Sequence, residues 1–405
     1  MALRSSVILP LFTSALLMGC AANDPADTDS GTDSDSDSDG TTAGPVEDYS
    51  CDDLMLPCVD ESACGPKASD YQPRTNMSAD DSWPACVSDG GTYQLVSDPP
   101  GSIARVMAFE EMANLLWRNS STPTADDFTM ARTQYLIEQG LWSRATRRED
   151  LHYPEIPMSE WSDQVDADKQ CTIPELWQKY PDRCVGPALI DPTIDENLQA
   201  GQDGNGDPWV NAAKVEAALV WFLYLSVYKE ANTCATVAAK DCDSAWAYYT
   251  GGNSDGLGIA TYIRAASQNT HDRIMDGLLA VRCWRDLNPP DPNMDDMWPL
   301  LDAVPQDQFD LFQQGWEQLD NALHRGYAVI VRERLIDHIG RVQNGVDTAP
   351  SWAFLQIAGP ILNREATERG APEAGTLAAL WQSDGSDEAT LAAGLDALDA
   401  AFPCP

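Results

Sequence analysis

Apolar side chains recur at the three- and four-residue spacing of helices over most of the chain after residue 101. The spacing predicts a first helix that begins near the N-cap residue Ser102 and ends near Asn119. Strand-like alternation is nearly absent, so we expect an all-α helical bundle. Further helices are predicted from Asp126 or Asp127 to about Thr146, then over 210–230, 243–252, 253 or 258 to 287, 306–345, 371–382 and 386–401.

One order of elements occurs twice in this part of the chain. A long apolar helix, a polar turn and a short Trp-Ala-aromatic helix end once with Ala245-Trp246-Ala247-Tyr248 and again with Ser351-Trp352-Ala353-Phe354. The repetition suggests a duplicated helical unit. In the second long helix, Gly315, Gly326 and Gly340 are candidate bends.

A proline-rich segment interrupts the helical pattern between Leu151 and Pro208. It predicts a long irregular insertion, tied by a bridge between Cys171 and Cys184. At its end, Asp203 to Asp207 has the oxygen spacing of a calcium loop, but Pro208 replaces the required glycine and Lys214 the bidentate acid. A turn is therefore favoured over calcium, with Asp207 or Asn211 capping the next helix.

The start of the chain has the features of a secretory signal. Arg4 and an apolar run from Val7 to Leu17 precede Leu16-Leu17-Met18-Gly19-Cys20, which resembles a bacterial lipoprotein processing box. We expect residues 1–19 to be a signal peptide and Cys20 to carry the lipid, palmitate included, as the membrane anchor. Because Ala21 follows, the sorting pattern indicates the bacterial outer membrane, with the protein facing the periplasm or the outside.

Composition divides the remainder into three parts. The Asp/Ser-rich stretch from Asn23 to Gly44 has no large apolar residue, which predicts a disordered acidic tether over 20–48. Residues 49–100 are rich in Cys, Pro and Asp and predict an irregular cap pinned by disulfides. Residues 101–405 form the helical domain.

The cysteines other than Cys20 form an even set with no C-x-x-C pair, which favours disulfides over a metal-thiolate site. Local bridges are expected among the four cysteines before Ala104, and between Cys234 and Cys242. The ten candidates are Cys51, Cys58, Cys64, Cys86, Cys171, Cys184, Cys234, Cys242, Cys283 and Cys404.

The formal net charge is −39, from 64 acidic and 25 basic residues. This excess argues against nucleic acid or anionic lipid headgroups as partners and favours cations. A protein adapted to salt would have the same excess without any ligand.

The second half of the chain resembles the low-iron-inducible, iron-assimilating periplasmic proteins known from green algae. The resemblance covers about residues 210–405 and rests on the stretch Ser244 to Gly252, on Val281-Arg282-Cys283, and on 309–319, 329–339 and 351–354 in the same order. Trp284-Arg285-Asp286 matches that family poorly. The resemblance implies a helical, non-enzymatic protein that binds iron or assists its acquisition, with an envelope protein as a further partner.

Iron binds carboxylate oxygens and imidazole, and two helices carry such groups at one-turn spacing. A third group is the R-E-x-x-E arrangement of Arg364 to Glu368, associated with iron handling in several transport systems. Solvated helix faces are the alternative for the first two groups, and a surface network of Glu and Arg is the alternative for the third. The candidate metal ligands are His271, Asp272, Asp276, Glu333, Asp337, His338, Glu365 and Glu368.

The sequence contains no H-E-x-x-H, P-loop or G-x-G-x-x-G motif, so we expect no enzyme. An imelysin-like helical envelope lipoprotein is the first alternative, and a His-Glu pocket in a helical-repeat topology would favour it. A structural or adhesive surface protein without a metal site is the second.

Overall fold

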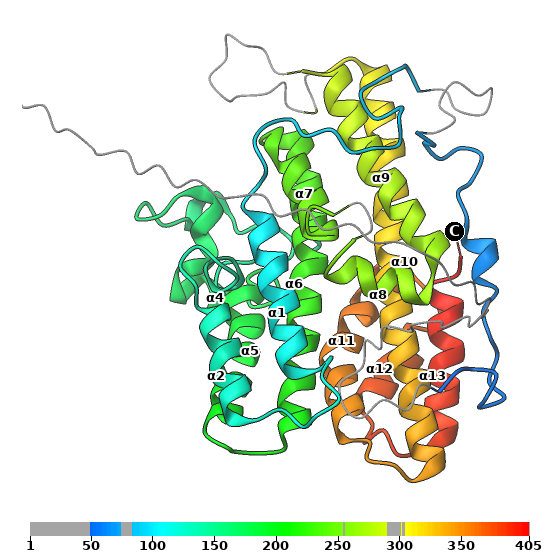
Figure 1. The fold of residues 1–405 in the computed structure, drawn as a ribbon. Helices are drawn as coiled ribbons and strands as arrows, with labels where there is room; N and C mark the ends of the chain where they lie inside the picture. The colour runs from blue at the N-terminus through cyan, green and yellow to red at the C-terminus, as the bar shows by residue number, and fades with distance from the viewer. Residues whose placement is uncertain (1–48, 74–82, 254–255, 290–300, 302–303, 405) are drawn as a thin grey trace, which may run out of the picture. The chain divides into compact units, whose positions relative to one another are not determined.

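The computed structural model describes residues 49–73, 83–253, 256–289, 301 and 304–404. Within these ranges the chain is all-α, as predicted, and contains no strand (Figure 1). Its helices are α1 (Ser102–Leu116), α2 (Ala125–Tyr135), α3 (Trp142–Ala145), α4 (Pro174–Lys179), α5 (Asp191–Gln202), α6 (Pro208–Thr236), α7 (Lys240–Thr250), α8 (Ile259–Ala266), α9 (Gln268–Leu287), α10 (Gln306–Asn344), α11 (Ala349–Glu368), α12 (Ala374–Gln382) and α13 (Glu388–Ala401).

Helix α6 lies at the centre and packs against α5, α7 and α11. Asp207 caps it, as expected, because its Oδ1 accepts the backbone N–H of Trp209 at 2.8 Å and of Val210 at 3.0 Å. By length and composition α6 could cross a membrane, yet 89% of its most apolar window is buried inside the protein. A buried core helix explains this composition without a membrane.

Two helical hairpins form the core of the bundle. One is formed by α6 and α7 and the other by α10 and α11, and α11 packs on α6 while α9 packs on α10 (Figure 1). Gly251 ends α7 and Gly345 ends α10, both at positive φ near 65°. Helix α10 continues through the three glycines that were expected to bend it. Gly340 instead allows the ring of Tyr49 to pack closely on the helix, since a Cβ at this position would lie 2.2 Å from that ring.

Three expected boundaries were wrong. The helix predicted to reach Thr146 ends at Tyr135, because the chain turns at Gln139, which has a φ of 61°. The segment 151–208 is more helical than expected, since α4, α5 and a π-helical turn (Gly186–Ile190) lie within it. Ser267 divides the helix expected before Leu287 into α8 and α9, and its side chain caps α9.

All ten cysteines in the described residues form disulfides. The bridges Cys51–Cys58, Cys171–Cys184 and Cys234–Cys242 are local, as predicted. Of the four cysteines before Ala104, only Cys51 and Cys58 form the expected local bridge, whereas Cys64 and Cys86 bond to cysteines far along the chain. The two long-range bridges are Cys64–Cys404 and Cys86–Cys283.

The long-range bridges reflect where the irregular segment over 49–100 lies. Asp70 forms a buried ion pair with Arg273 of α9, and Gln318 of α10 exchanges two hydrogen bonds with the backbone of Tyr71. The described parts of this segment therefore pack against α9 and α10 and, through Tyr93 and Val96, against Asp243 of α7. The lipoprotein box, Cys20 and the acidic tether lie outside the described residues.

Candidate functional site

The structure does not bring the eight predicted metal ligands to one point. Three of them lie on α9, three on α10 and two on α11. The α9 group lines an open cleft, the α10 group is dispersed around its helix, and only one α11 residue joins a buried cluster.

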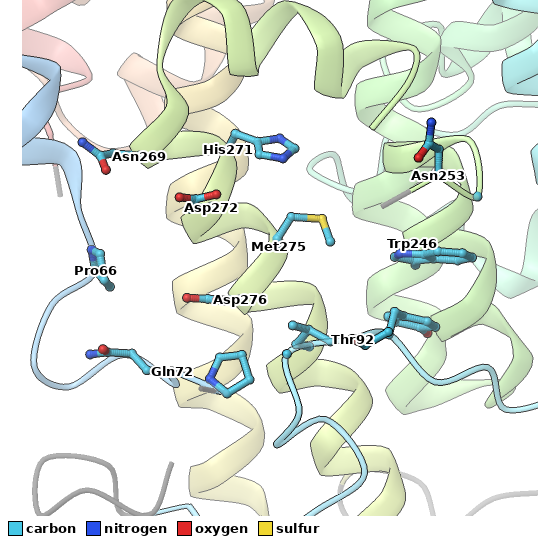
Figure 2. A pocket seen from close by; sticks show the side chains of 15 residues that line it. Pro66, Gln72, Thr92, Trp246, Asn253, Asn269, His271, Asp272, Met275 and Asp276 are labelled. Carbon is cyan, nitrogen blue, oxygen red and sulfur yellow. The ribbon is translucent and has the colours of Figure 1, made fainter. Parts of the chain in front are cut away.

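His271, Asp272 and Asp276 line a cleft of about 940 Å³, which we call the α9 cleft. Figure 2 shows α9 between two other walls: the irregular N-terminal segment on one side and Trp246 of α7 on the other. Trp246 stacks on Tyr93, with ring centroids 4.8 Å apart. The cleft therefore offers aromatic and carboxylate groups that are spread over a wide surface.

His271 is largely committed to the fold. It is 4% exposed, and its Nδ1 lies 3.0 Å from the hydroxyl of Tyr249. Burial lowers its pKa despite the opposing effect of neighbouring Asp272, so the ring is neutral at pH 7. Asp272 is exposed and accepts a hydrogen bond from Gln268 at 2.9 Å.

The three α10 candidates face different surroundings. The Glu333 side chain is 47% exposed, whereas Asp337 is buried and accepts a 2.8 Å hydrogen bond from Arg341. Both ring nitrogens of His338 lie 2.8 Å from protein partners, Oγ of Ser351 and the carbonyl oxygen of Gly385. His338 therefore has no ring nitrogen left for a metal in this conformation.

The two glutamates of the R-E-x-x-E arrangement also separate. Glu368 is exposed, while Glu365 is buried and faces α10. Its Oε2 lies 3.0 Å from Nε2 of His324. Glu365 thus belongs to a cluster that the sequence analysis did not identify.

That cluster is the best-formed candidate site, and we call it the His–carboxylate centre: His152, Asp320, His324 and Glu365. Potential ligand atoms of His152, Asp320 and His324 all lie within 4.8 Å of one another. Two other groups of metal-ligand types contain Cys51, Cys58, Cys64 and Cys404, whose sulfurs are in disulfides and provide no thiolate.

Local geometry explains how the centre is assembled. Asp320 and His324 are one turn apart on α10, so their side chains share a face. His152 lies on the loop after α3, where Asp150 positions it: Oδ1 of Asp150 is 3.0 Å from the backbone nitrogen and 2.6 Å from Nδ1 of the ring. This contact leaves Nε2 of His152 as the nitrogen that can serve a ligand.

Aromatic rings shield one side of the centre. His152 stacks on Tyr228 of α6, with centroids 3.9 Å apart, and Tyr224 packs against both histidines. Among the described residues, Nε2 of His152 and the hydroxyls of Tyr224 and Tyr327 are buried without a hydrogen-bond partner. Several unsatisfied polar atoms close to one another are typical of a site that holds a ligand, an ion or water.

Two titrations in the centre are coupled. Burial opposes the charged form of His324, but hydrogen bonds to Asp320 and Glu365 outweigh it and raise the pKa of His324 to about 9. For Glu365, burial is likewise outweighed by His324 and Arg369, which lower its pKa to about 2. At pH 7 an imidazolium therefore faces a carboxylate.

The formal charges around the centre balance in this state. Asp150, Asp320 and Glu365 contribute three negative charges. Arg364, which pairs with Asp150, and Arg369, which pairs with Glu365, contribute two positive charges, and protonated His324 contributes the third. Because a metal-ligating imidazole must be deprotonated, a metal bound at this centre would have to displace the proton from His324.

His152, Asp320 and His324 are not among the ligands predicted from the sequence. For Asp320 and His324 a signal existed, since their four-residue spacing is the same as that used to select Asp272 and Asp276. For His152 there was none, because its loop meets α10 only through the tertiary fold.

A scan against protein-family models and searches of curated proteins and solved structures found no match to this chain. The resemblance to the iron-assimilating family stays a prediction.

Proposed function

We propose that the protein is an envelope lipoprotein that binds iron, without enzymatic activity, at the His–carboxylate centre. The observation that carries the proposal is the convergence of two imidazoles and a carboxylate within 4.8 Å, next to buried polar atoms that lack partners. Two histidines with carboxylates form a donor set that suits iron. Glu365, which lies beside His324, supplies a further oxygen.

A cavity lies next to the residues that position the centre. It measures about 320 Å³ and is lined by Asp150 and Arg364 together with apolar residues that include Trp221 and Pro360. Asp150 contacts His152 directly, so one residue separates the cavity from the centre.

A structural role is the alternative for these charges. Buried ion networks occur without any metal, and Arg364 and Arg369 already neutralise part of the negative charge. The two interpretations differ in one measurable property, which is saturable binding of a cation.

The test is calorimetric titration of the purified protein with ferrous iron under anaerobic conditions, and separately with ferric and calcium ions. We expect a single iron site that His324→Ala weakens at least about tenfold. Glu365→Gln and Glu368→Gln form a matched pair from one motif. The first should weaken iron binding, and the second, which alters an exposed side chain, should not.

Saturable binding that responds to neither His324→Ala nor Glu365→Gln would place the metal elsewhere. Absence of saturable binding in the parent protein would favour the structural or adhesive alternative. Circular dichroism and thermal melting of each variant separate loss of a ligand from loss of the fold.

One observation favours the imelysin-like alternative within the same proposal. His324 and Glu365 form a His–Glu pair across α10 and α11, one of the two hairpins. Under either resemblance iron should depend on this pair.

The lipid anchor at Cys20 belongs to the proposal and rests on the sequence alone. We expect Cys20→Ala to leave the precursor unprocessed or to release the protein from the outer-membrane fraction. Cell fractionation with immunodetection measures this, and a variant that stays in the outer-membrane fraction would contradict the anchor.

A further inference from the structure

Another cleft, which is lined in part by the end of α6, contains more basic than acidic side chains. It measures about 690 Å³ and lies between the end of α6, the start of α7, the start of α1 and the loops around residues 144–183. We call it the basic cleft. Seven of the chain's 25 Lys and Arg residues line it, against five acidic residues, although acids outnumber bases by 64 to 25 in the whole chain.

Arg148 is the central residue of this cleft. It is 4% exposed, and its guanidinium lies over the rings of Phe222 and Tyr248, at 5.1 and 5.6 Å. Its nearest carboxylate, that of Glu230, is 3.6 Å away. Among the residues the structure describes, the guanidinium makes no hydrogen bond, and its Nε is fully buried.

A buried guanidinium with no hydrogen bond is unfavourable, because the water it loses is not replaced. Arginine normally satisfies its planar set of donors with a carboxylate or phosphate, often in bidentate geometry. Arg148 therefore lacks the partner that its burial requires.

Three further cations around the cleft are only partly satisfied. Nε of Arg105 is buried without a partner, although its other nitrogens reach Gln139 and Tyr248. Within the described ranges, half-buried Arg144 and exposed Lys240 form no hydrogen bond or ion pair. The three remaining cations are paired with Asp168, Glu149 and Glu230.

We propose that the basic cleft binds a multiply charged oxyanion, through phosphate or carboxylate groups that Arg148 and Arg144 contact. Such an anion would supply acceptors to guanidinium donors that form no hydrogen bond with the described residues. The net negative charge of the protein repels anions in general. Anion binding in the cleft therefore requires several cations that converge on the ligand. Only a ligand with two or more negative charges offers a partner to each of these cations.

This site is independent of the metal proposal. None of its cations contacts the His–carboxylate centre through a bond that the structure shows, and either site could be lost without the other. Calorimetry of the metal-free protein keeps the two questions apart.

The test is titration of the purified protein, in chelator-treated buffer of low ionic strength, with pyrophosphate and with citrate. We expect saturable binding of at least one of them, weakened about tenfold or more by Arg148→Gln and by Arg144→Gln. Arg132→Gln is the control, since it removes the same charge from the ion pair between Arg132 of α2 and Asp195 of α5, neither of which lines the cleft. Pyrophosphate against citrate distinguishes a phosphate ligand from a carboxylate ligand.

Arg144→Gln protects the test against misfolding, because that side chain has no hydrogen bond or ion pair with the described residues to lose. Two results would overturn the proposal: no binding of either anion by the parent protein, or equal weakening by Arg132→Gln and Arg144→Gln. The second would mean that only the overall charge matters. If Arg148→Met stabilises the protein and leaves anion affinity unchanged, the buried guanidinium is structural and its assigned role is wrong.

Discussion

The α9 cleft and the His–carboxylate centre contain the same kinds of residue, and their difference lies in convergence. In the cleft, His271, Asp272 and Asp276 come from one helix and face a wide opening. In the centre, His152 and His324 come from separate segments and meet inside the protein with Asp320. A metal requires ligands on several sides, which a single helix face does not provide.

The two regions also shift the pKa of a buried histidine in opposite directions. The pKa of His271 is lowered, mainly because burial is not offset by a hydrogen-bonded carboxylate. The pKa of His324 rises to about 9, because Asp320 and Glu365 bond to the ring. Burial alone thus does not determine the charge of a histidine; the partners do.

The largest expected effect comes from removing a disulfide near the α9 cleft, which should change the stability of the protein and leave the His–carboxylate centre unaffected. Replacing Cys86 and Cys283 by Ser removes a bridge with a sequence separation of 197 next to the α9 cleft, and should lower the free energy of unfolding by about 3–5 kcal/mol. Iron affinity at the centre should not change. Urea denaturation and calorimetry measure the two quantities.

The matched control is Cys51→Ser with Cys58→Ser, which opens a loop with a separation of only seven residues. Its loss should be smaller, since a shorter loop restricts the unfolded chain less. An equal or larger loss for this pair would contradict the argument from loop length.

A smaller effect should appear in the pH dependence of stability. Because the folded pKa of His271 lies below its usual 6.5, the unfolded chain takes up a proton first as the pH falls. The stabilising contribution is present above pH 6.5 and is lost as the pH falls toward the folded pKa. His271→Gln should therefore flatten the decline in unfolding free energy between about pH 7 and 5.

The groups that face His271 are Asp272, Arg264 and Tyr249. The control is Asn269→Ala, which changes a neighbour that does not titrate and should leave the pH dependence of the unfolding free energy unchanged. Denaturant melts over the pH range measure both variants. A slope that stays the same in His271→Gln would show that this ring does not titrate as described.

The smallest effect is expected for Asp272→Asn. This exposed carboxylate accepts one hydrogen bond from Gln268, so stability should change by less than about 0.5 kcal/mol and iron affinity by less than about twofold. Asp320→Asn is the counterpart in the centre and should weaken iron binding. If the two substitutions weaken it equally, the metal binds in the cleft instead.

The helices were predictable where apolar residues recur along the side of the helix that is buried. The apolar spacing over 210–230 predicted α6, and Asp207, one of the two residues expected to cap it, does so. The long helix after Pro305 was also predicted, since its apolar positions recur without a break. Local patterns carry this information because helical hydrogen bonds are local.

The site was predictable only in part, and the reason is sequence distance. Glu365 was named from its motif, but its partner His324 lies 41 positions earlier, and the spacing gives no register between two packed helices. The bridge from Cys64 to Cys404 was missed for the same reason. Contacts that join distant segments depend on how whole helices pack.

That bridge has a mechanical consequence. With Cys64 joined to Cys404 across a separation of 340 residues, nearly the whole helical chain becomes a covalent ring. A pull on the N-terminal segment, such as a membrane tether would exert, passes through the sulfur link into the C-terminal end. Force applied in this way therefore does not unfold the helices within the ring one after another. It is transmitted through the disulfide and not through the helices that carry the His–carboxylate centre and the basic cleft.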